Sequence, residues 1–447
     1  MLSTNPYKGT KDFYPRDQLI QNFIFEKWKK ISQSHSFEEY QTPIIEPAEI
    51  YEAKSGEDVG NKELFTFSDL AERKLCLRPE MTPSVTRIVA ARYKELPKPI
   101  KYFSIGSFYR NERPQKGRNR EFWQINADIF GDNSIYSDIE VLTLALDIME
   151  EFQAPANSYT LYINHRELLN DFYNLLNLSP EIKISVTRIV DKYEKLSLPV
   201  FHQELAKYLS EDEIKKVEKF LSLNTKELID VFPFLNNSKG FEQINLILET
   251  LNKLGYEGII KFKPSLVRGF DYYDGLVFEV FDNNPENNRS LFGGGRYNGL
   301  AAIFGQNNFP AVGFAVGNET FRIFLENWDL IPENRKLIGK KQIGIFAVKN
   351  SSEKEKNQLL INQVFIISRE IRKLCPNIII DTFLESKSPS AGLELASNKN
   401  YEYCLIIGED EINDKKITIK EMGTGSQKTL TLHELISFLK QLPYEIN

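Results

Sequence analysis

The spacing of hydrophobic positions changes several times along the chain, and each change predicts a different element. Apolar residues recur every three or four positions over residues 16–35 and again through residues 166–262, which predicts one helix and then a mostly helical segment. Residues 100–130 instead read as two extended stretches around a turn, which predicts a long two-stranded unit. Strand signals return at residues 277–281, and the glycine-rich stretch at residues 292–295 is expected to be a turn.

The last part of the chain has a pattern of its own. Short apolar strands are predicted at residues 343–348, 377–382 and 403–407, with helical patterns between them. This alternation predicts a separate α/β domain over residues 341–447. The preceding stretch at residues 326–340 contains proline, asparagine and glycine and is expected to be a linker.

Length and composition narrow the class of protein. With 447 residues, 41% of them hydrophobic, and a net charge of −6, the chain is typical of a folded protein of two or three domains. No apolar run approaches the roughly 20 residues of a membrane helix, and the N-terminus lacks the pattern of a signal peptide, so we expect no membrane partner. Three widely separated cysteines favour the reducing cytoplasm. The four histidines form no His-Glu-x-x-His motif, and no metal-binding residues are predicted.

One face of the two-stranded unit carries candidate chemistry. Because side chains alternate along a strand, Gln124, Asn126 and Asp128 share its open face, and the first and last lie about 13 Å apart at ~3.3 Å per residue. Residues 101–120 hold six positive side chains against one negative. Such a run is usually a solvated loop. Here a carboxylate, two amides and the guanidinium of Arg110 together suit a small zwitterionic ligand beside a phosphate.

Longer motifs carry a resemblance to a known family. Residues 108–124 (Phe-Tyr-Arg-Asn-Glu-Arg-Pro-Gln-Lys-Gly-Arg-Asn-Arg-Glu-Phe-Trp-Gln) resemble motif 2 of class II aminoacyl-tRNA synthetases in the form found in histidyl-tRNA synthetases. Further blocks resemble that family in the same order along the chain: residues 8–12, 42–43, 77–82, 266–273, 293–297 and 407–411 with Lys420. Several long motifs in order are far more specific than a single short glycine pattern.

The resemblance implies an α+β fold with two domains. Residues 1–325 would form a class II synthetase catalytic domain, an antiparallel sheet flanked by helices, with a helical insertion at about residues 166–262. The α/β domain at residues 341–447 would be the anticodon-binding domain.

The resemblance also implies roles for individual residues. Catalysis would depend on Arg268 and Arg110, because fixed guanidinium groups stabilise charge that develops at the α-phosphate. The residues expected to bind ATP are Arg110, Glu112, Arg118 and Glu319. Those expected to bind histidine are Glu80, Thr82, Gln124, Asp128, Tyr272, Tyr273 and Tyr297. A carboxylate and a hydroxyl suit an ammonium group, and a carboxylate with a phenol suits an imidazole.

Two positions depart from the family pattern. Thr320 stands where the motif 3 arginine is expected, directly after Glu319, which leaves the details of triphosphate binding open. Asp128 stands where some relatives carry the longer glutamate, so the pocket would be slightly tighter or hold a water.

The expected function is that of a histidine–tRNA ligase. It would activate histidine with ATP and Mg²⁺ to histidyl-adenylate and transfer histidine to the 3′ end of tRNA(His), and motif 1 would form a homodimer. The alternative is a synthetase-like paralogue that binds histidine as a regulatory subunit. A prolyl, threonyl or glycyl relative is disfavoured by the block at residues 266–273. Histidine-dependent exchange of pyrophosphate into ATP separates these alternatives.

Overall fold

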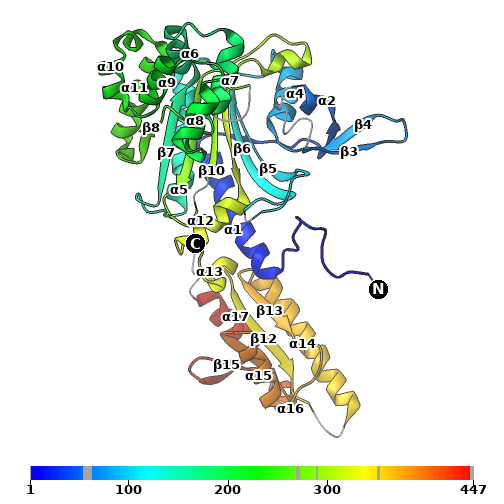
Figure 1. Cartoon of the computed structure of the whole chain (residues 1–447). Coiled ribbons are helices and arrows are strands. Elements are labelled where there is room, and N and C mark those ends of the chain that lie inside the picture. The colour runs from blue at the N-terminus through cyan, green and yellow to red at the C-terminus, as the bar shows by residue number, and fades with distance from the viewer. Residues whose placement is uncertain are drawn as a thin grey trace. The chain divides into compact units, whose positions relative to one another are not determined.

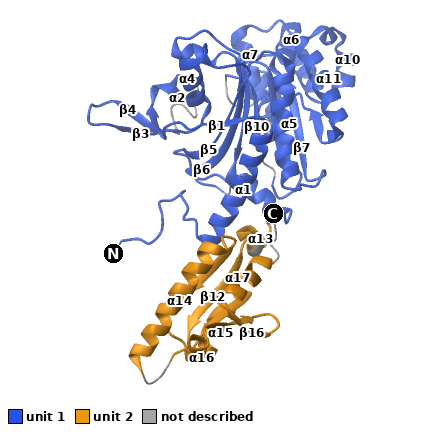
Figure 2. Ribbon diagram, turned by 180° about the vertical axis from the view of Figure 1, so that it is seen from behind, with its two compact units in different colours: residues 1–331 blue, residues 332–447 orange. Residues whose placement is uncertain are grey.

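The computed structural model describes residues 2–53, 63–115, 117–267, 272–287, 290–349 and 353–442. The chain divides into two compact units, Met1–Ile331 and Pro332–Asn447 (Figure 2). The border between them falls inside the segment 326–340 that the sequence marks as a linker. Across the described ranges, every helix is too short or too polar to cross a membrane.

The first unit is built on a mixed sheet of eight strands (Figure 1). In sheet order the strands are β1 (Glu38–Glu39), β5 (Ile100–Tyr109), β6 (Glu121–Phe130), β11 (Ala311–Gly317), β10 (Ser290–Arg296), β9 (Leu276–Asp282), β7 (Tyr159–His165) and β8 (Ile260–Phe262). The outermost pairs, β1–β5 and β7–β8, are parallel, and the pairs between them are antiparallel. The predicted two-stranded unit is therefore the β5–β6 pair, and the expected antiparallel sheet is confirmed.

Helices cover one face of this sheet. They include α1 (Pro15–Ser34), α5 (Ile135–Glu151) and α12 (Asn318–Asn327), while α2 (Glu49–Glu52), α4 (Thr82–Arg92) and the short helix η4 (Leu300–Phe304) lie elsewhere in the unit. The predicted N-terminal helix is confirmed, and it buries Ile20, Ile24 and Trp28 at intervals of about one turn. Helix α5 packs against β6 and β11. The opposite face of these two strands is left open for a cavity.

The segment between β7 and β8 is helical, as predicted. It contains α6 (Arg166–Leu175), α7 (Pro180–Val190), η1 (Tyr193–Lys195), α8 (Leu198–Leu205), α9 (Glu211–Leu221), α10 (Thr225–Val231), η2 (Pro233–Asn237), α11 (Lys239–Leu251) and η3 (Asn252–Tyr256). Its last three residues are strand β8 rather than helix, paired in parallel with β7. A parallel pair needs a long crossover connection, and this segment provides it. The helices gather beside β7 and β8 (Figure 1).

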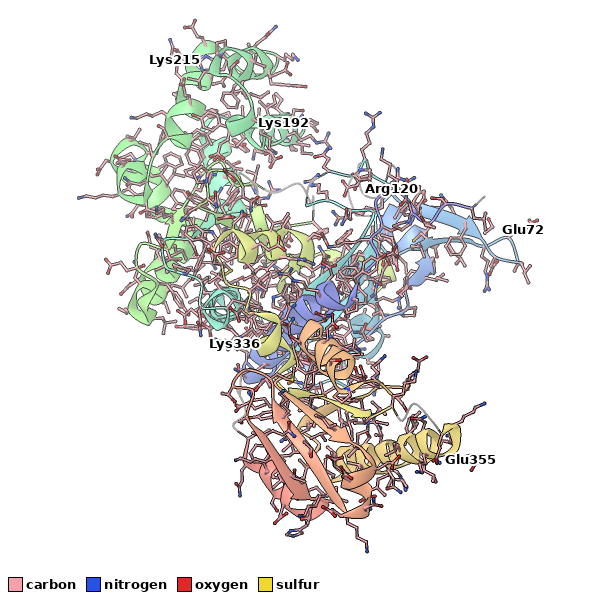
Figure 3. The ribbon with its side chains drawn as sticks, turned by 90° about the horizontal axis from the view of Figure 1, so that it is seen from below. Glu72, Arg120, Lys192, Lys215, Lys336 and Glu355 are labelled. Carbon is pink, nitrogen blue, oxygen red and sulfur yellow. The ribbon has the colours of Figure 1, made fainter. Side chains whose placement is uncertain are left out.

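A small sheet projects from the first unit. It joins β2 (Ile45–Pro47), β4 (Lys74–Leu77) and β3 (Phe65–Ser68) in antiparallel order. Glu72 lies at the outer end of the β3–β4 hairpin (Figure 3) and has a φ of 60°, which a tight turn requires. This hairpin exposes Phe67 and Leu70 to solvent.

The second unit is an α/β domain with its own core. Its sheet has the order β13 (Ile378–Thr382), β12 (Lys341–Ala347), β14 (Tyr403–Ile407), β15 (Lys416–Glu421) and β16 (Gln427–Thr431). Its helices are α13 (Asn334–Ile338), α14 (Lys354–Leu374), α15 (Pro389–Asn398), α16 (Glu409–Asn413) and α17 (Leu432–Gln441). The three predicted strands are confirmed as β12, β13 and β14, which are mutually parallel. The antiparallel strands β15 and β16 were not predicted.

The expected turn at residues 292–295 is wrong. These residues form the middle of β10, which pairs with β9 on one side and β11 on the other. The glycines are needed for close packing, not for turning: a Cβ atom on Gly294 would lie 2.0 Å from the carbonyl oxygen of Gly313. A larger side chain would therefore separate the two strands.

Candidate active site

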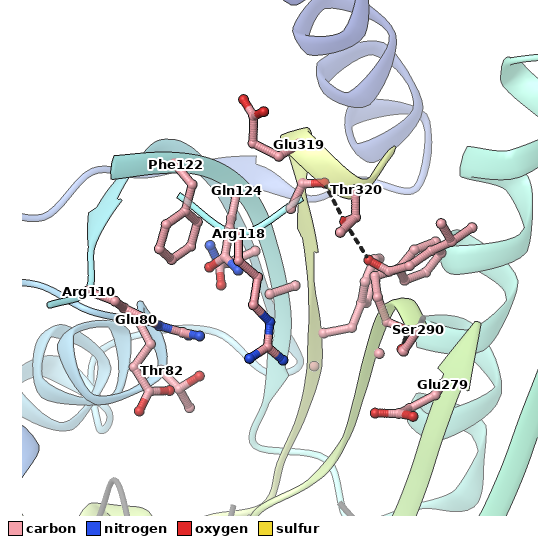
Figure 4. Close-up of a pocket in the computed structure, with 18 of the residues that line it drawn as sticks. Glu80, Thr82, Arg110, Arg118, Phe122, Gln124, Glu279, Ser290, Glu319 and Thr320 are labelled. Carbon is pink, nitrogen blue, oxygen red and sulfur yellow. Dashed lines mark hydrogen bonds between the residues drawn. The ribbon is translucent and has the colours of Figure 1, made fainter. Parts of the chain in front are cut away.

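A cavity of about 290 Å³ lies over the open face of the sheet in the first unit. It is lined by eleven of the predicted site residues: Glu80, Thr82, Arg110, Glu112, Arg118, Gln124, Asp128, Tyr272, Tyr273, Tyr297 and Glu319. The remaining predicted residue, Arg268, lies outside the described residues. Figure 4 shows Glu80, Thr82 and Arg110 on one side of the cavity, with Glu279 and Ser290 on the other.

The floor of the cavity is a row of polar side chains on β6 facing a row of small residues on β11. Gln124, Asn126 and Asp128 line the cavity, while Ile125 and Ala127 are fully buried on the other face, which confirms the predicted alternation. The partners of the three polar residues on β11 are Gly317, Ala315 and Gly313. Because these partners have little or no side chain, they leave room for a ligand above the polar row.

The carboxylate of Asp128 lies on this floor and is only 4% exposed. Its Oδ1 accepts a hydrogen bond of 2.5 Å from the hydroxyl of Tyr297. Burial raises the pKa of Asp128 to about 7; the hydrogen bond from Tyr297 opposes this shift, and the nearby charge of Glu80 adds to it. A Cβ atom on Gly313 would lie 1.9 Å from Oδ1, so the carboxylate rests directly on the backbone of β11.

Glu80 and Thr82 approach the cavity from a second segment. Thr82 is the first residue of α4, and Glu80, which precedes it, accepts a hydrogen bond of 3.1 Å from the hydroxyl of Tyr272. The buried guanidinium of Arg78 fixes this segment by donating to the carbonyl oxygens of Thr42 and Ser107, each at 3.0 Å. Arg78 thus positions the loop without lining the cavity, and the sequence assigned it no role.

The basic side chains of the β5–β6 connection form another wall. Arg110 donates from Nε to the carbonyl oxygen of Pro79 at 3.2 Å, and its guanidinium lies 5.2 Å from the ring centre of Phe122. Neither of these contacts uses a terminal nitrogen of the guanidinium, and Arg110 lines the cavity. Arg118, which is 61% exposed, lies 3.7 Å from the carboxylate of Glu112. This wall can therefore bind an anionic group.

The strand-to-helix turn between β11 and α12 places Thr320, not an arginine, at the cavity. The hydroxyl of Thr320 donates toward the carbonyl oxygens of Leu291 at 3.1 Å and Gly317 at 3.3 Å (Figure 4). Arg322 does not line the cavity, because its guanidinium is paired at 2.8 Å with Asp17 of α1 and at 2.8 Å with Glu326.

The cavity also contains residues that the sequence analysis gave no role. Glu279 of β9 and Phe314 of β11 are examples, and both could have been found from the period of two along their strands. Within the described ranges, no group of three acidic, cysteine or histidine side chains could hold a metal ion by itself. The Nδ1 atom of His165 accepts a hydrogen bond from the backbone N–H of Glu167 and caps α6, which is a structural role.

A sheet with antiparallel central strands and a polar cavity on one face, walled by a basic strand connection and closed by a strand-to-helix turn, is the architecture of the catalytic domain of a class II aminoacyl-tRNA synthetase. Comparisons with known proteins specify the family. A family model described as "Histidyl-tRNA synthetase" matches residues 9–321, and a model described as "Anticodon binding domain" matches residues 370–442. The chain therefore belongs to the histidyl-tRNA synthetase family.

Individual relatives cover nearly the whole chain. A histidine–tRNA ligase of Leptospira biflexa is 36% identical over 98% of both chains, and one of Thermoplasma volcanium is 32% identical over 97% of this chain and 98% of its own. Among solved structures, the histidyl-tRNA synthetase of Nostoc has a TM-score of 0.78 at 20% identity, covering 99% of this chain and 100% of that one. A Bacillus halodurans structure described as an ATP phosphoribosyltransferase regulatory subunit/histidyl-tRNA synthetase has a TM-score of 0.71 at 22% identity, covering 91% and 98%.

Proposed function

We propose that this protein is a histidine–tRNA ligase that activates histidine with ATP and transfers it to the 3′ end of tRNA(His). The observation that carries the proposal is a cavity in which a basic wall meets the buried Asp128–Tyr297 pair. Curated relatives that match almost end to end are named as histidine–tRNA ligases, which supports the enzyme and not the regulatory alternative.

The roles proposed for the walls follow from their chemistry. Arg110 and Arg118 would bind the phosphates of ATP, and Glu112 and Glu319 would lie close to the same nucleotide. Arg268, by resemblance, would add positive charge at the α-phosphate as the carboxylate of histidine attacks and pyrophosphate leaves.

Histidine would lie along the polar row of β6. Glu80, Thr82 and Gln124 would hold its ammonium and carboxylate groups at one end, and Asp128 would hold its imidazole at the other. Tyr272, Tyr273 and Tyr297 would enclose the ring. Binding ATP and histidine side by side gives the reacting carboxylate and α-phosphate the proximity that adenylate formation needs.

Magnesium would accompany ATP and not occupy a site made by the protein alone. Mg²⁺ usually keeps several waters and binds through substrate phosphates with one or two carboxylates. Glu112 and Glu319, which both line the cavity, fit that modest requirement. When bound, the cation would neutralise charge on the outer phosphates.

The partners of the enzyme would be tRNA(His) and a second copy of the chain. The second unit would bind the anticodon, in keeping with the family model that matches residues 370–442. Ile44 and Ile45 follow directly after residues 42–43 and are 41% and 50% exposed, which supports an apolar contact between two copies at motif 1. The free, buried thiols of Cys76, Cys375 and Cys404 fit a reducing cytoplasm.

Exchange of labelled pyrophosphate into ATP tests the proposal directly. Each of the twenty amino acids is supplied in turn, and only histidine should support exchange. A dimeric, folded protein that exchanges with none of them would favour the regulatory paralogue, and exchange with another amino acid would overturn the substrate assignment.

A further inference from the structure

The block at residues 8–12, which resembles the family, has no part in the roles proposed above. The structure places the start of this block against the β5–β6 connection, residues 110–120. The carbonyl oxygen of Gly9 accepts hydrogen bonds from the backbone N–H groups of Arg120 at 2.7 Å and Glu121 at 3.2 Å. The contact is made by residues 7–10, the N-terminal strap, and none of the described residues that line the cavity belongs to it.

Arg120 connects the N-terminal strap to the wall of the cavity. Its guanidinium lies 5.0 Å from the ring centre of Tyr7, and its Nη1 donates to the hydroxyl of Tyr7 at 2.5 Å and to the carbonyl oxygen of Lys8 at 3.3 Å. Its Nε donates to the carbonyl oxygen of Glu112 at 3.0 Å, and its own carbonyl oxygen accepts from the backbone N–H of Arg110 at 2.8 Å. The residue that the strap holds therefore holds the backbone of two residues expected to bind ATP.

Gly9 is where the N-terminal strap and the connection approach most closely. Its φ is 94°, and a Cβ atom on it would lie 2.8 Å from Cγ of Arg120 and 2.8 Å from Cγ of Pro114. Any other residue would strain the backbone and push the strap away from the connection. The strap itself lies at the surface, since Tyr7 is 58% exposed, so displacing it should leave the core of the first unit intact.

We propose that the N-terminal strap positions the β5–β6 connection for ATP binding, with Arg120 as the positioning residue. This inference rests on the proposed function, in which Arg110, Glu112 and Arg118 bind the nucleotide. The carboxylate of Glu112 lies 3.7 Å from the guanidinium of Arg118, so a shift of the backbone at Glu112 would disturb both side chains. The row proposed to bind histidine is held instead by its register with β11. The strap therefore acts on ATP far more than on histidine.

Gly9→Ala tests this division in the full-length protein. The assay is histidine-dependent exchange of pyrophosphate into ATP, with each substrate varied in turn. We expect the KM for ATP to rise at least about fivefold while the KM for histidine stays within about twofold. Tyr7→Ala removes the ring beside Arg120 without straining the backbone, and it should raise the KM for ATP by about threefold, as the loss of an exposed cation–π contact would.

The matched control is Gly255→Ala. Gly255 has a φ of 102°, close to that of Gly9, but no heavy atom lies within 4 Å of the position of its Cβ. The control thus has the same backbone strain without the collision, and both of its KM values should match wild type. The proposal is overturned if Gly9→Ala leaves the KM for ATP within about twofold of wild type, if it raises both KM values equally, or if Gly255→Ala has the same effect.

A second readout does not depend on catalysis. Cleavage of the native protein by trypsin after Arg118, followed by mass spectrometry, reports how often the connection opens locally. Gly9→Ala should be cut at least about threefold faster than wild type, and Gly255→Ala at the wild-type rate. Equal rates in all three proteins would overturn the proposal. If the rates differ as expected but the wild type shows no exchange with histidine, the proposed function fails and the hold of the strap on the connection stands.

Discussion

Replacing Asp128 by asparagine should stabilise the protein in a way that depends on pH, even though it removes a group proposed to bind histidine. Burial raises the pKa of this carboxyl from 3.8 to about 7. Between these values the folded state holds a proton that the unfolded state has released. The folded state is therefore favoured by this group at low pH, and the advantage is lost as the pH rises through 7.

The size of the effect follows from the pKa. One pKa unit corresponds to about 1.4 kcal/mol, so the wild-type protein should lose about 2 kcal/mol of stability from this carboxyl between pH 5.5 and pH 8. Asparagine does not titrate. The free energy of unfolding of Asp128→Asn, relative to wild type, should therefore rise by about 2 kcal/mol over the same interval, while histidine binding falls at least tenfold.

Urea unfolding followed by tryptophan fluorescence measures this difference. All three tryptophans, Trp28, Trp123 and Trp328, lie in the first unit, so the signal reports that unit alone. Protein concentration is held fixed because a dimer would make stability depend on it. If the difference in unfolding free energy between Asp128→Asn and wild type is the same at pH 5.5 and pH 8, the reasoning is refuted, since Asp128 would then titrate near its ordinary pKa.

A second buried aspartate provides the contrast. Asp138 is 3% exposed and binds Arg296 through two hydrogen bonds of 2.9 Å, although burial raises its pKa to about 6. Asp138→Asn would leave the buried guanidinium of Arg296 without its counter-charge and should destabilise the protein by about 3–5 kcal/mol. Asp128→Asn should therefore raise the free energy of unfolding and Asp138→Asn should lower it, because only Asp138 is ion-paired.

Four further outcomes are expected. Gly313→Ala should raise the KM for histidine at least tenfold, because its Cβ would lie 1.9 Å from the Asp128 carboxylate, whereas Gly299→Ala, with no heavy atom within 4 Å, should match wild type in the same exchange assay. Arg322→Ala should leave the KM for ATP within about twofold, because two carboxylates already hold that guanidinium; a tenfold rise, about 1.4 kcal/mol, would show that it reaches the nucleotide. Arg268→His should slow adenylate formation by about 10²–10³ with little change in histidine KM, and a pure binding loss would contradict its catalytic role. Deleting residues 332–447 should preserve exchange but sharply reduce tRNA charging, provided the truncated protein has the mass of the full-length oligomer; full charging would contradict the anticodon role.

Much of the fold could be predicted from local pattern alone. The N-terminal helix, the β5–β6 pair and the three parallel strands of the second unit, β12, β13 and β14, were predicted, and the structure confirms them. The glycine run at residues 292–295 was misjudged because glycine favours turns only where no neighbouring strand demands close approach. Strand β16 was missed because a short polar edge strand resembles a loop in sequence, and β15 was missed although Lys416–Glu421 alternates.

The candidate site was predicted from sequence motifs and from the alternation of side chains along one strand. Such local patterns cannot show which strands become neighbours in the sheet. The period of two placed Gln124, Asn126 and Asp128 on one face before any partner strand was known. It could not show that β11 lies beside them, and so it could not show that Gly313 and Ala315 leave the space above them empty.

The arrangement of the site gives a structural reason for aspartate, rather than the longer glutamate of some relatives, at position 128. The carboxylate contacts the backbone of β11 at Gly313 and the hydroxyl of Tyr297, so its place is set on two sides before any ligand arrives. A longer glutamate would have to project further above the row, into the space where the ring is proposed to lie. Aspartate at position 128 therefore keeps the space above the row clear, and in the proposed complex it would offer one acceptor to an N–H of the imidazole.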